Sequence, residues 1–235
     1  MRASSRPPAE TTAAGYFGAM AADYDDFIRR AVPRYEEMSA RLVDYLPPTA
    51  HRVLELGCGT GNLSLRLAAR YPDAHLVLVD ASPEMIATTR ARLAAAHPAA
   101  SVEFHTERFE SLHLEPASFD VVTSSISLHH VVDKAPVYAA VAAALAPGGT
   151  FRFSDQLGGS ATNHGHNWRR WLDHCREPGN CSEADIQSLL DHAAAHDHYT
   201  PLDEQFRLLA AAGLTDLDCV WRNWIWGIVT ADKPA

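Results

Sequence analysis

The sequence lacks several features that would assign it to other classes of protein. Its four cysteines form no C-x-x-C pair, so neither a disulfide framework nor a zinc knuckle is predicted and the thiols are expected to be reduced. No apolar run approaches the roughly 20 residues that a helix needs to span a bilayer. Residues 1–15 lack the apolar core of a signal peptide. The formal net charge of −9 disfavours general binding to nucleic acid or to anionic membranes. We therefore expect a cytoplasmic protein with a flexible tail over 1–15.

The rest of the chain alternates apolar strands with helices. Such alternation with short connections predicts a parallel sheet with helices on both faces, and the 235 residues fit a single domain over 16–235. Two helices are predicted first, over 16–30 and 33–46. Strands are then predicted over 52–55, 75–79, 102–105, 119–123 and 150–154, and helices over 62–70, 83–96 and 133–145, the last one ended by the Pro-Gly-Gly of 147–149.

The region 158–195 breaks this rhythm. It is polar and rich in histidine and tryptophan, and we expect a helical insertion above the sheet. Trp168 and Trp171 are expected to pack in its core or, as the second possibility, to form a wall for a hydrophobic substrate. A helix over 202–212 and two strands over 214–220 and 224–230 follow. The link between these strands is too short for a crossover, so they are predicted to be antiparallel.

The main functional signal is the stretch VLELGCGTG, residues 53–61. Gly57, Gly59 and Gly61 follow a predicted strand at every second position, just after Glu55. In an open parallel sheet, ligands bind at the carboxyl ends of the strands. Glycines let the backbone approach a ligand closely, and the helix N-terminus that follows attracts an anionic group. Asp80 ends the next strand, where a carboxylate can accept both hydroxyls of a ribose.

This turn does not match a dinucleotide site. The spacing is G-x-G-x-G, whereas a dinucleotide turn requires G-x-G-x-x-G. No Lys or Arg lies between Glu55 and Leu65, and the Glu55 carboxylate would repel a phosphate. A ligand with a ribose, a small zwitterion and a positive centre fits better, and S-adenosylmethionine is such a ligand.

With these residues the sequence resembles the class I S-adenosylmethionine-dependent methyltransferases of the small-molecule type. Five blocks carry the resemblance in order: VLELGCGTG (53–61), VLVDAS (77–82), FDVVTSSISLHHV (119–131), LAPGGTFRFSDQ (145–156) and LLAAAGLTDLDCVW (208–221). The resemblance implies a Rossmann-like α/β fold with a seven-stranded, mostly parallel sheet whose last strand is antiparallel. It also implies a helical N-terminal lid over 16–48 and an insertion after the fifth strand, over 158–200.

The resemblance further implies how the cofactor S-adenosylmethionine, and its product S-adenosylhomocysteine, would be held. The glycine turn would line the methionine portion with Glu55 beneath it, and Asp80 would bind the ribose. The predicted cofactor-binding residues are Tyr24, Glu55, Gly57, Cys58, Gly59, Gly61, Asp80, Ala81, Met85, Glu107, Arg108 and Ser124, and Tyr16 and Phe17 of the lid are further candidate contacts.

Histidines follow the predicted fourth strand, where the substrate of such a protein would lie. His129 and His130 are adjacent, so their side chains point in different directions. One of them is predicted to act as a catalytic base or to contact the substrate, while the other caps or packs. Asp155 ends the fifth strand at the same rim and either supports the base or is a surface residue.

A second group of histidines lies in the insertion. His192 and His196 are four residues apart, a spacing that can bind a metal on one helix face. There is no H-E-x-x-H motif, so no metal site is predicted. This helix is expected to line a pocket or to face solvent.

Methyl transfer requires alignment of the acceptor atom and exclusion of water, and a base only where the acceptor must lose a proton. We predict a methyltransferase that acts on an oxygen or nitrogen atom of a small organic molecule, as a monomer or homodimer, without a direct nucleic-acid partner. Three alternatives stay open. They are a tRNA-modification enzyme resembling the carboxy-S-adenosylmethionine synthases, a non-catalytic subunit that binds S-adenosylmethionine, and a protein or peptide acceptor.

Overall fold

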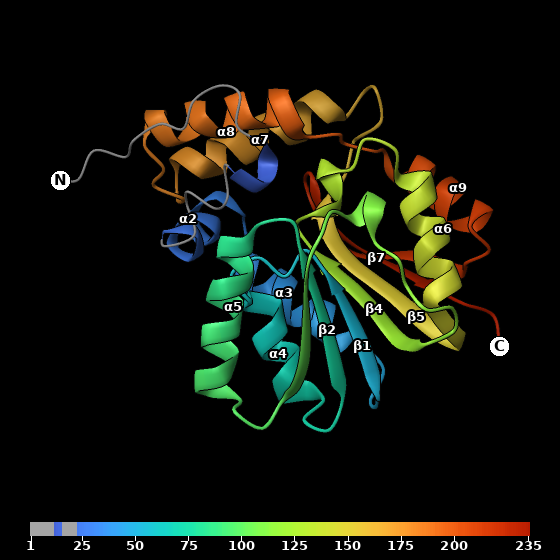
Figure 1. The fold of residues 1–235 in the computed structure, drawn as a ribbon. Coiled ribbons are helices and arrows are strands. Elements are labelled where there is room, and N and C mark those ends of the chain that lie inside the picture. The colour runs from blue at the N-terminus through green and yellow to red at the C-terminus, as the bar shows by residue number, and fades with distance from the viewer. Residues whose placement is uncertain (1–11, 16–22) are drawn as a thin grey trace.

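The computed structural model describes residues 12–15 and 23–235, which contain a seven-stranded sheet (Figure 1). The strand order is β3-β2-β1-β4-β5-β7-β6. All neighbouring strands are parallel except β7, which is antiparallel to both β5 and β6. This confirms the predicted fold class, including the antiparallel last strand. The strands are β1 (Arg52–Leu56), β2 (His75–Asp80), β3 (Ser101–Thr106), β4 (Phe119–Ser125), β5 (Leu145–Gln156), β6 (Thr215–Asn223) and β7 (Trp226–Asp232).

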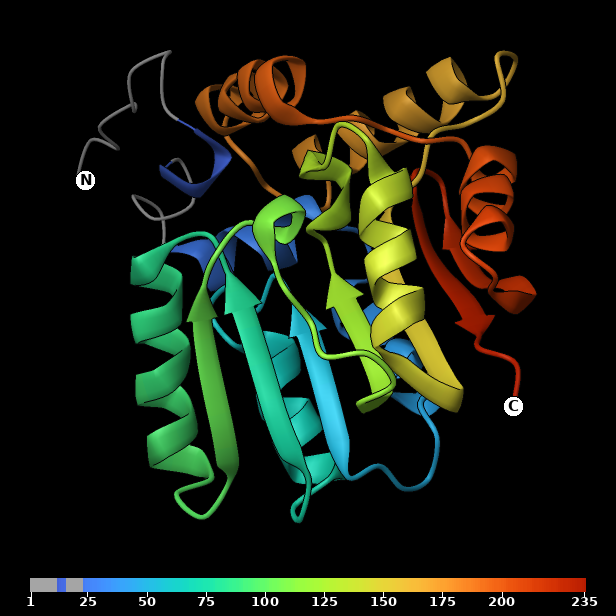
Figure 2. The ribbon, with the colours of Figure 1, turned by 45° about the vertical axis from the view of Figure 1, so that its right-hand side comes forward.

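Helices cover both faces of the sheet (Figures 1 and 2). Alternate residues of one strand point to opposite faces, so Val53 packs in one apolar core and Leu54 in the other. Because both faces are buried, the central strands β1, β2 and β4 carry apolar residues on both faces in their middle parts, as is typical of parallel sheets. One core holds α3 (Tyr35–Asp44), α4 (Asn62–Arg70) and α5 (Pro83–Ala96), and the other holds α6 (Lys134–Ala144) and α9 (Leu202–Ala211).

A third group of helices lies over the carboxyl ends of the strands (Figure 2). It consists of α2 (Tyr24–Ala31), α7 (His164–Arg176) and α8 (Glu183–His196). The last two lie within the predicted insertion. Trp171 is buried, as expected, and its indole Nε1 donates a hydrogen bond of 2.8 Å to the Ala31 carbonyl oxygen. The insertion therefore packs against the N-terminal helix above the sheet.

Several element boundaries differ from the prediction. Helix α2 begins at Tyr24 within the described residues, and α3 begins at Tyr35. Helix α6 ends at Ala144, before the predicted Pro-Gly-Gly, and β5 begins at the next residue. The residue before a proline is disfavoured in a helix, which accounts for the helix ending ahead of Pro147. Tyr16, Phe17 and most of the predicted tail lie outside the described residues.

In the part of the chain that the structure describes, no helix is long and apolar enough to cross a membrane.

Candidate functional site

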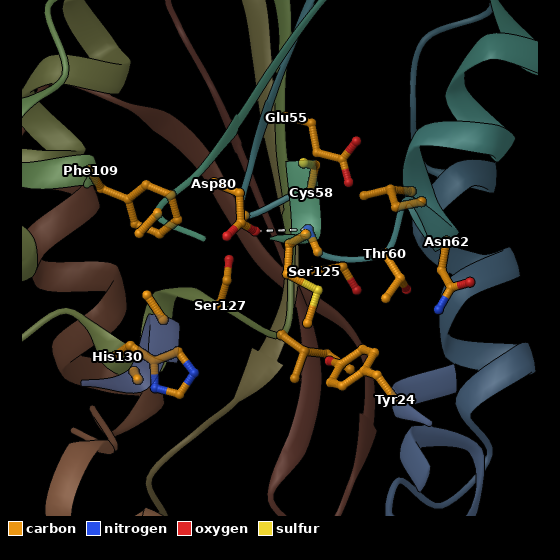
Figure 3. Close-up of a pocket in the computed structure, with 18 of the residues that line it drawn as sticks. Tyr24, Glu55, Cys58, Thr60, Asn62, Asp80, Phe109, Ser125, Ser127 and His130 are labelled. Carbon is orange, nitrogen blue, oxygen red and sulfur yellow. Dashed lines mark hydrogen bonds between the residues drawn. The ribbon is translucent and has the colours of Figure 1, made fainter. Parts of the chain in front are cut away.

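A cavity opens at the carboxyl ends of the central strands, beside the glycine turn (Figure 3). Most of the predicted cofactor residues line it: Tyr24, Glu55, Gly57, Cys58, Gly59, Asp80, Ala81, Met85 and Arg108. Sequence reasoning missed other lining residues, among them Tyr35, Thr60, Asn62, Phe109, Ser125, Ile126 and Ser127. Figure 3 shows Asp80 and Ser127 between Glu55 at one end of the view and Tyr24 and His130 at the other.

The glycine turn requires glycine for two reasons. Gly57, Gly59 and Gly61 have φ angles of 76°, 54° and 88°, in the left-handed region that other residues rarely adopt. A Cβ atom on Gly57 would also collide with the side chain of Ser127, whereas one on Gly59 would meet nothing within 4 Å. The turn therefore packs tightly at Gly57 and leaves open space at Gly59.

Three of the predicted cofactor residues are not among the described residues that line the cavity. A Cβ atom on Gly61 would approach Thr89 of α5 to 3.0 Å, so Gly61 serves close packing. Ser124 is buried, and its hydroxyl donates to the Leu56 carbonyl oxygen at 2.8 Å. Glu107 is exposed. The three positions support the turn and strand ends or face solvent.

Asp80 connects the glycine turn to the end of β2. One of its carboxylate oxygens accepts the Gly59 N–H at 2.8 Å (dashed in Figure 3), and the other accepts the Ser82 N–H at 2.9 Å. Burial raises the pKa of Asp80, and these two hydrogen bonds oppose the rise. Each carboxylate oxygen has two lone pairs, so both can accept a further hydrogen bond from a ligand.

Glu55 is a buried acid beneath the turn, with 1% of its surface exposed. Burial raises its pKa to about 8, against the opposing effect of a 2.5 Å hydrogen bond from the Ser64 hydroxyl. The carboxyl group is therefore mainly protonated at pH 7, and a cation bound next to it would favour its ionised form.

Asp25 joins helix α2 to the glycine turn. It accepts hydrogen bonds from the Thr60 hydroxyl at 2.6 Å and from the Asn62 amide at 2.9 Å. It also forms an ion pair of 2.9 Å with Arg92 of α5, which in turn donates to the Thr60 carbonyl oxygen at 2.7 Å. Sequence reasoning missed Asp25, since 35 residues separate it from Thr60.

The two adjacent histidines lie in the 3₁₀ turn η2 (Leu128–His130), which follows β4. His130 lines the cavity. His129 is buried behind it, and both its backbone N–H and its Nδ1 contact Asp155, at 3.0 and 2.5 Å. Burial lowers the pKa of His129, but the hydrogen bond and charge of Asp155, together with the charge of Asp197, outweigh this effect and raise it. Asp155 is thus a buried partner of His129 rather than a surface residue.

A second cavity lies beside the first and shares Tyr24 and Ile126 with it. Its apolar wall includes Phe27, Leu189, Trp171 and Trp226, and its polar residues are His129, Gln156, His192 and Asp197. None of its described lining residues is Arg or Lys. The predicted i, i+4 helix thus lines a pocket through His192.

Asp197 lies where the histidines of η2 and α8 converge. Its Oδ1 is 3.1 Å from His130 Nδ1, 3.5 Å from His192 Nε2 and 3.8 Å from His129 Nε2. Its Oδ2 accepts a hydrogen bond of 2.5 Å from the Tyr199 hydroxyl. Sequence reasoning missed Asp197 and Tyr199, because only the fold brings 129–130 and 192–199 together.

The chain matches a known family model and several curated proteins. Residues 53–149 match the model described as "Methyltransferase domain". The chain is 38% identical over 117 residues to the ubiquinone biosynthesis O-methyltransferase of Xanthomonas axonopodis pv. citri, covering 49% of this chain and 46% of that protein. It is 30% identical over 159 residues to the trans-aconitate 2-methyltransferase of Streptomyces avermitilis, covering 65% and 56%. The chain thus spans about half the length of the curated relatives that it matches.

Solved structures share the fold at lower sequence identity. The YcgJ protein of Bacillus subtilis superposes with a TM-score of 0.64 at 17% identity, over 85% of this chain and 99% of that one. Haemonchus contortus phosphoethanolamine N-methyltransferase 2 in complex with S-adenosyl-L-methionine superposes with a TM-score of 0.67 at 16% identity, over 92% and 57%. At these identities the likeness shows the fold alone.

Proposed function

The chain belongs to the class I S-adenosylmethionine-dependent methyltransferases, and on this premise we propose that it transfers a methyl group from S-adenosylmethionine to an oxygen or nitrogen atom of a small organic molecule. The observation that carries the proposal is a pair of neighbouring cavities at the strand ends, which share Tyr24 and Ile126. The first has the shape and polarity for the cofactor, and the second lies where an acceptor would meet the methyl group.

The first cavity would hold the cofactor through the glycine turn and the two acids beside it. The open space at Gly59 lets a ligand approach the backbone. Both oxygens of Asp80 keep a lone pair for ribose hydroxyls, and the Glu55 carboxyl group can ionise next to the ammonium group of the methionine portion. Ala81 and Met85, after the end of β2, would flank the adenine.

The second cavity supports a compact acceptor with an apolar body. Its wall is aromatic and aliphatic, and its polar end carries imidazoles and the Asp197 carboxylate, with no Arg or Lys among the described lining residues. An acceptor rich in carboxylates, such as the trans-aconitate in the name of one relative, would meet Asp197 without a compensating cation there. A hydroxyl or amine on a neutral or cationic molecule suits these residues better.

In the transfer step, a lone pair of the acceptor atom forms a bond to the methyl carbon as the carbon–sulfur bond breaks, and the bonding electrons pass to sulfur. The acceptor's proton must leave. The cluster of His129, His130, His192 and Asp197 lies between the two cavities, and we assign the handling of this proton to it. Asp155 would act as a positioning residue through its two contacts with His129.

Calorimetry with S-adenosylhomocysteine tests the cofactor site. Asp80→Ala is expected to weaken binding by about 1.5–3 kcal/mol, since charge-assisted hydrogen bonds of this size would be lost. Asp73→Ala is the matched control, because Asp73 is exposed just before the other end of the same strand and should bind as wild type does. Equal affinity of both variants, or tight binding of NADH, would contradict the assignment.

An assay with methyl-labelled S-adenosylmethionine and a metabolite extract tests the transfer. We expect label to appear in a small molecule, and only with protein whose Asp80 is intact. Binding of S-adenosylhomocysteine without label transfer to any small molecule would instead favour a non-catalytic subunit or a macromolecular acceptor.

A further inference from the structure

We propose that His129, His130 and Asp197 form a binding site for a divalent transition-metal ion at the boundary of the two cavities. The sequence predicts no metal here. The candidate ligand atoms of these three residues all lie within 4.8 Å of one another, and the side chains of His129 and Asp197 are 3% and 4% exposed.

The two spacings to Asp197 lie near those of a coordination shell. With metal–nitrogen and metal–oxygen bonds of about 2.0–2.2 Å, two ligands of a tetrahedral ion lie about 3.3–3.5 Å apart. Asp197 Oδ1 lies 3.1 Å from His130 Nδ1 and 3.8 Å from His129 Nε2. The second distance is too long for a hydrogen bond and is compatible with an ion that both atoms bind.

The residues around the cluster orient its ligands as in known metal sites. A metal-bound histidine almost always donates its other ring N–H to a carboxylate or carbonyl oxygen. His129 Nδ1 lies 2.5 Å from Asp155 Oδ1, which places the N–H there and leaves the lone pair of Nε2 directed towards Asp197. The second oxygen of Asp197 accepts the Tyr199 hydroxyl. Each of these two ligands thus has a hydrogen-bonding partner on its far side.

The donor set points to the class of metal. Two imidazoles and one carboxylate suit Zn²⁺ and other divalent ions of the later first transition series, whereas Mg²⁺ and Ca²⁺ prefer oxygen ligands. Three protein ligands leave a coordination position for a substrate atom or water, as in catalytic rather than structural sites. His192 Nε2, 3.5 Å from Asp197 Oδ1, borders that position from α8.

An ion at this place would activate the acceptor, a consequence that rests on the proposed function. Bound to the acceptor hydroxyl, it would lower the hydroxyl's pKa. Because His129, His130 and Asp197 would then be ligands, the proton would leave to His192 or solvent, and the cluster as a whole would handle it only without an ion. The oxygen then attacks the methyl carbon as the electrons of the carbon–sulfur bond pass to sulfur. The site itself can be tested without any acceptor.

The test is a titration of chelator-treated, untagged full-length protein with ZnCl₂, by calorimetry against a competing chelator and by visible absorption with Co²⁺. We expect one equivalent to bind. Asp197→Asn removes an anionic ligand and should lower the affinity by more than about 100-fold, while Tyr199→Phe, which removes only a supporting hydrogen bond, should lower it by about 10- to 100-fold. Calorimetry with S-adenosylhomocysteine reports on the cofactor site in each variant.

The chain has 13 histidines, so His113→Ala, at an exposed position, is the control for adventitious binding. The site is supported if His113→Ala still binds one equivalent of Zn²⁺ while Asp197→Asn and Tyr199→Phe bind it more weakly. Equal Zn²⁺ affinity in all variants, or no stoichiometric binding to the wild type, overturns it and leaves a cluster that shares protons. If Asp197→Asn also fails to bind S-adenosylhomocysteine, its loss of Zn²⁺ could reflect a disturbed fold. The Zn²⁺ affinity of Tyr199→Phe then decides whether the metal site exists. Loss of cofactor binding by Asp80→Ala with Zn²⁺ binding intact separates this inference from the proposed function.

Discussion

Glu55 provides a residue-scale signal for cofactor binding, because burial raises the pKa of its carboxyl group to about 8. The ammonium group of S-adenosylhomocysteine would stabilise the carboxylate and lower this pKa. We therefore predict that binding at pH 7 releases up to about one proton and that the release declines as the pH rises above about 8, where Glu55 is already ionised. Calorimetry in buffers of different ionisation enthalpy measures the number of protons.

Glu55→Gln is the control for this prediction, since it keeps the shape and a hydrogen-bonding partner for Ser64 but cannot ionise. The variant should bind S-adenosylhomocysteine without releasing a proton. Release of the same number of protons by the variant would assign the effect to another group.

At the same scale, the sequence predicts the residues whose positions are set locally. Gly57 and Gly59 lie in the turn after β1 and Asp80 ends β2, so the parallel sheet alone brings them to one edge. Ser127 and Phe109 line the same cavity, but they come from turns whose course depends on packing. Asp197 reaches His130 only through the fold of the insertion, which no short motif specifies.

At the scale of elements, α2 is held on the glycine turn by one side chain. Thr60 and Asn62 line the cofactor cavity, and Asp25 fixes both. We predict that Asp25→Ala weakens S-adenosylhomocysteine binding by about 1–2 kcal/mol, or 5- to 30-fold, because the turn loses its preformed geometry.

Asp26→Ala is the matched control, since Asp26 is the next residue on α2 and is exposed. Calorimetry should show wild-type affinity for it. Equal losses in the two variants would attribute the effect to the charge of the helix and not to the hydrogen bonds of Asp25.

The strands of the sheet were predictable because the hydrophobic pattern and the length of each apolar segment indicate a strand. The predicted strands correspond to β1–β7. The helices α4 and α5 have the predicted bounds, whereas α3 and α6 differ from them by one or two residues at each end. The sequence pattern carried α6 on to 145, whereas the structure ends it at Ala144, where the approaching Pro147 and the pairing of β5 compete with helix formation. In the insertion, the sequence predicted helices but not their ends, although a local capping box of Ser182 and Asp185 marks the start of α8.

At the scale of the whole molecule, the fold places two cavities side by side under one set of helices. Helix α2 contributes Tyr24 to both cavities. It contacts the glycine turn through Asp25 and the insertion through the bond from Trp171 to the Ala31 carbonyl oxygen. The two cavities therefore share a covering layer that includes α2 and the insertion.

This shared layer predicts where cofactor binding slows hydrogen exchange. An opening that separates α2 from the glycine turn would destroy the cofactor site, so bound ligand must oppose it. At 100 times the dissociation constant, S-adenosylhomocysteine would disfavour such an opening by about 2.7 kcal/mol, or about 100-fold. Amides of α2 and of α7, which packs on it, should thus exchange up to about 100-fold more slowly, whereas local openings of the β6–β7 hairpin at the sheet edge leave the site intact and should be unaffected.

Mass spectrometry of exchanged peptides, with and without ligand, makes this measurement. Asp25→Ala at a matched degree of saturation is the control, because it removes the hydrogen bonds that join α2 to the turn. If those hydrogen bonds couple α2 to the bound cofactor, the ligand should slow amide exchange in α2 and α7 much less in the variant than in the wild type. The glycine turn should be protected by the ligand in both proteins. Protection confined to the glycine turn in the wild type would mean that the covering helices open independently of the cofactor, and the two cavities would then fill without influencing each other.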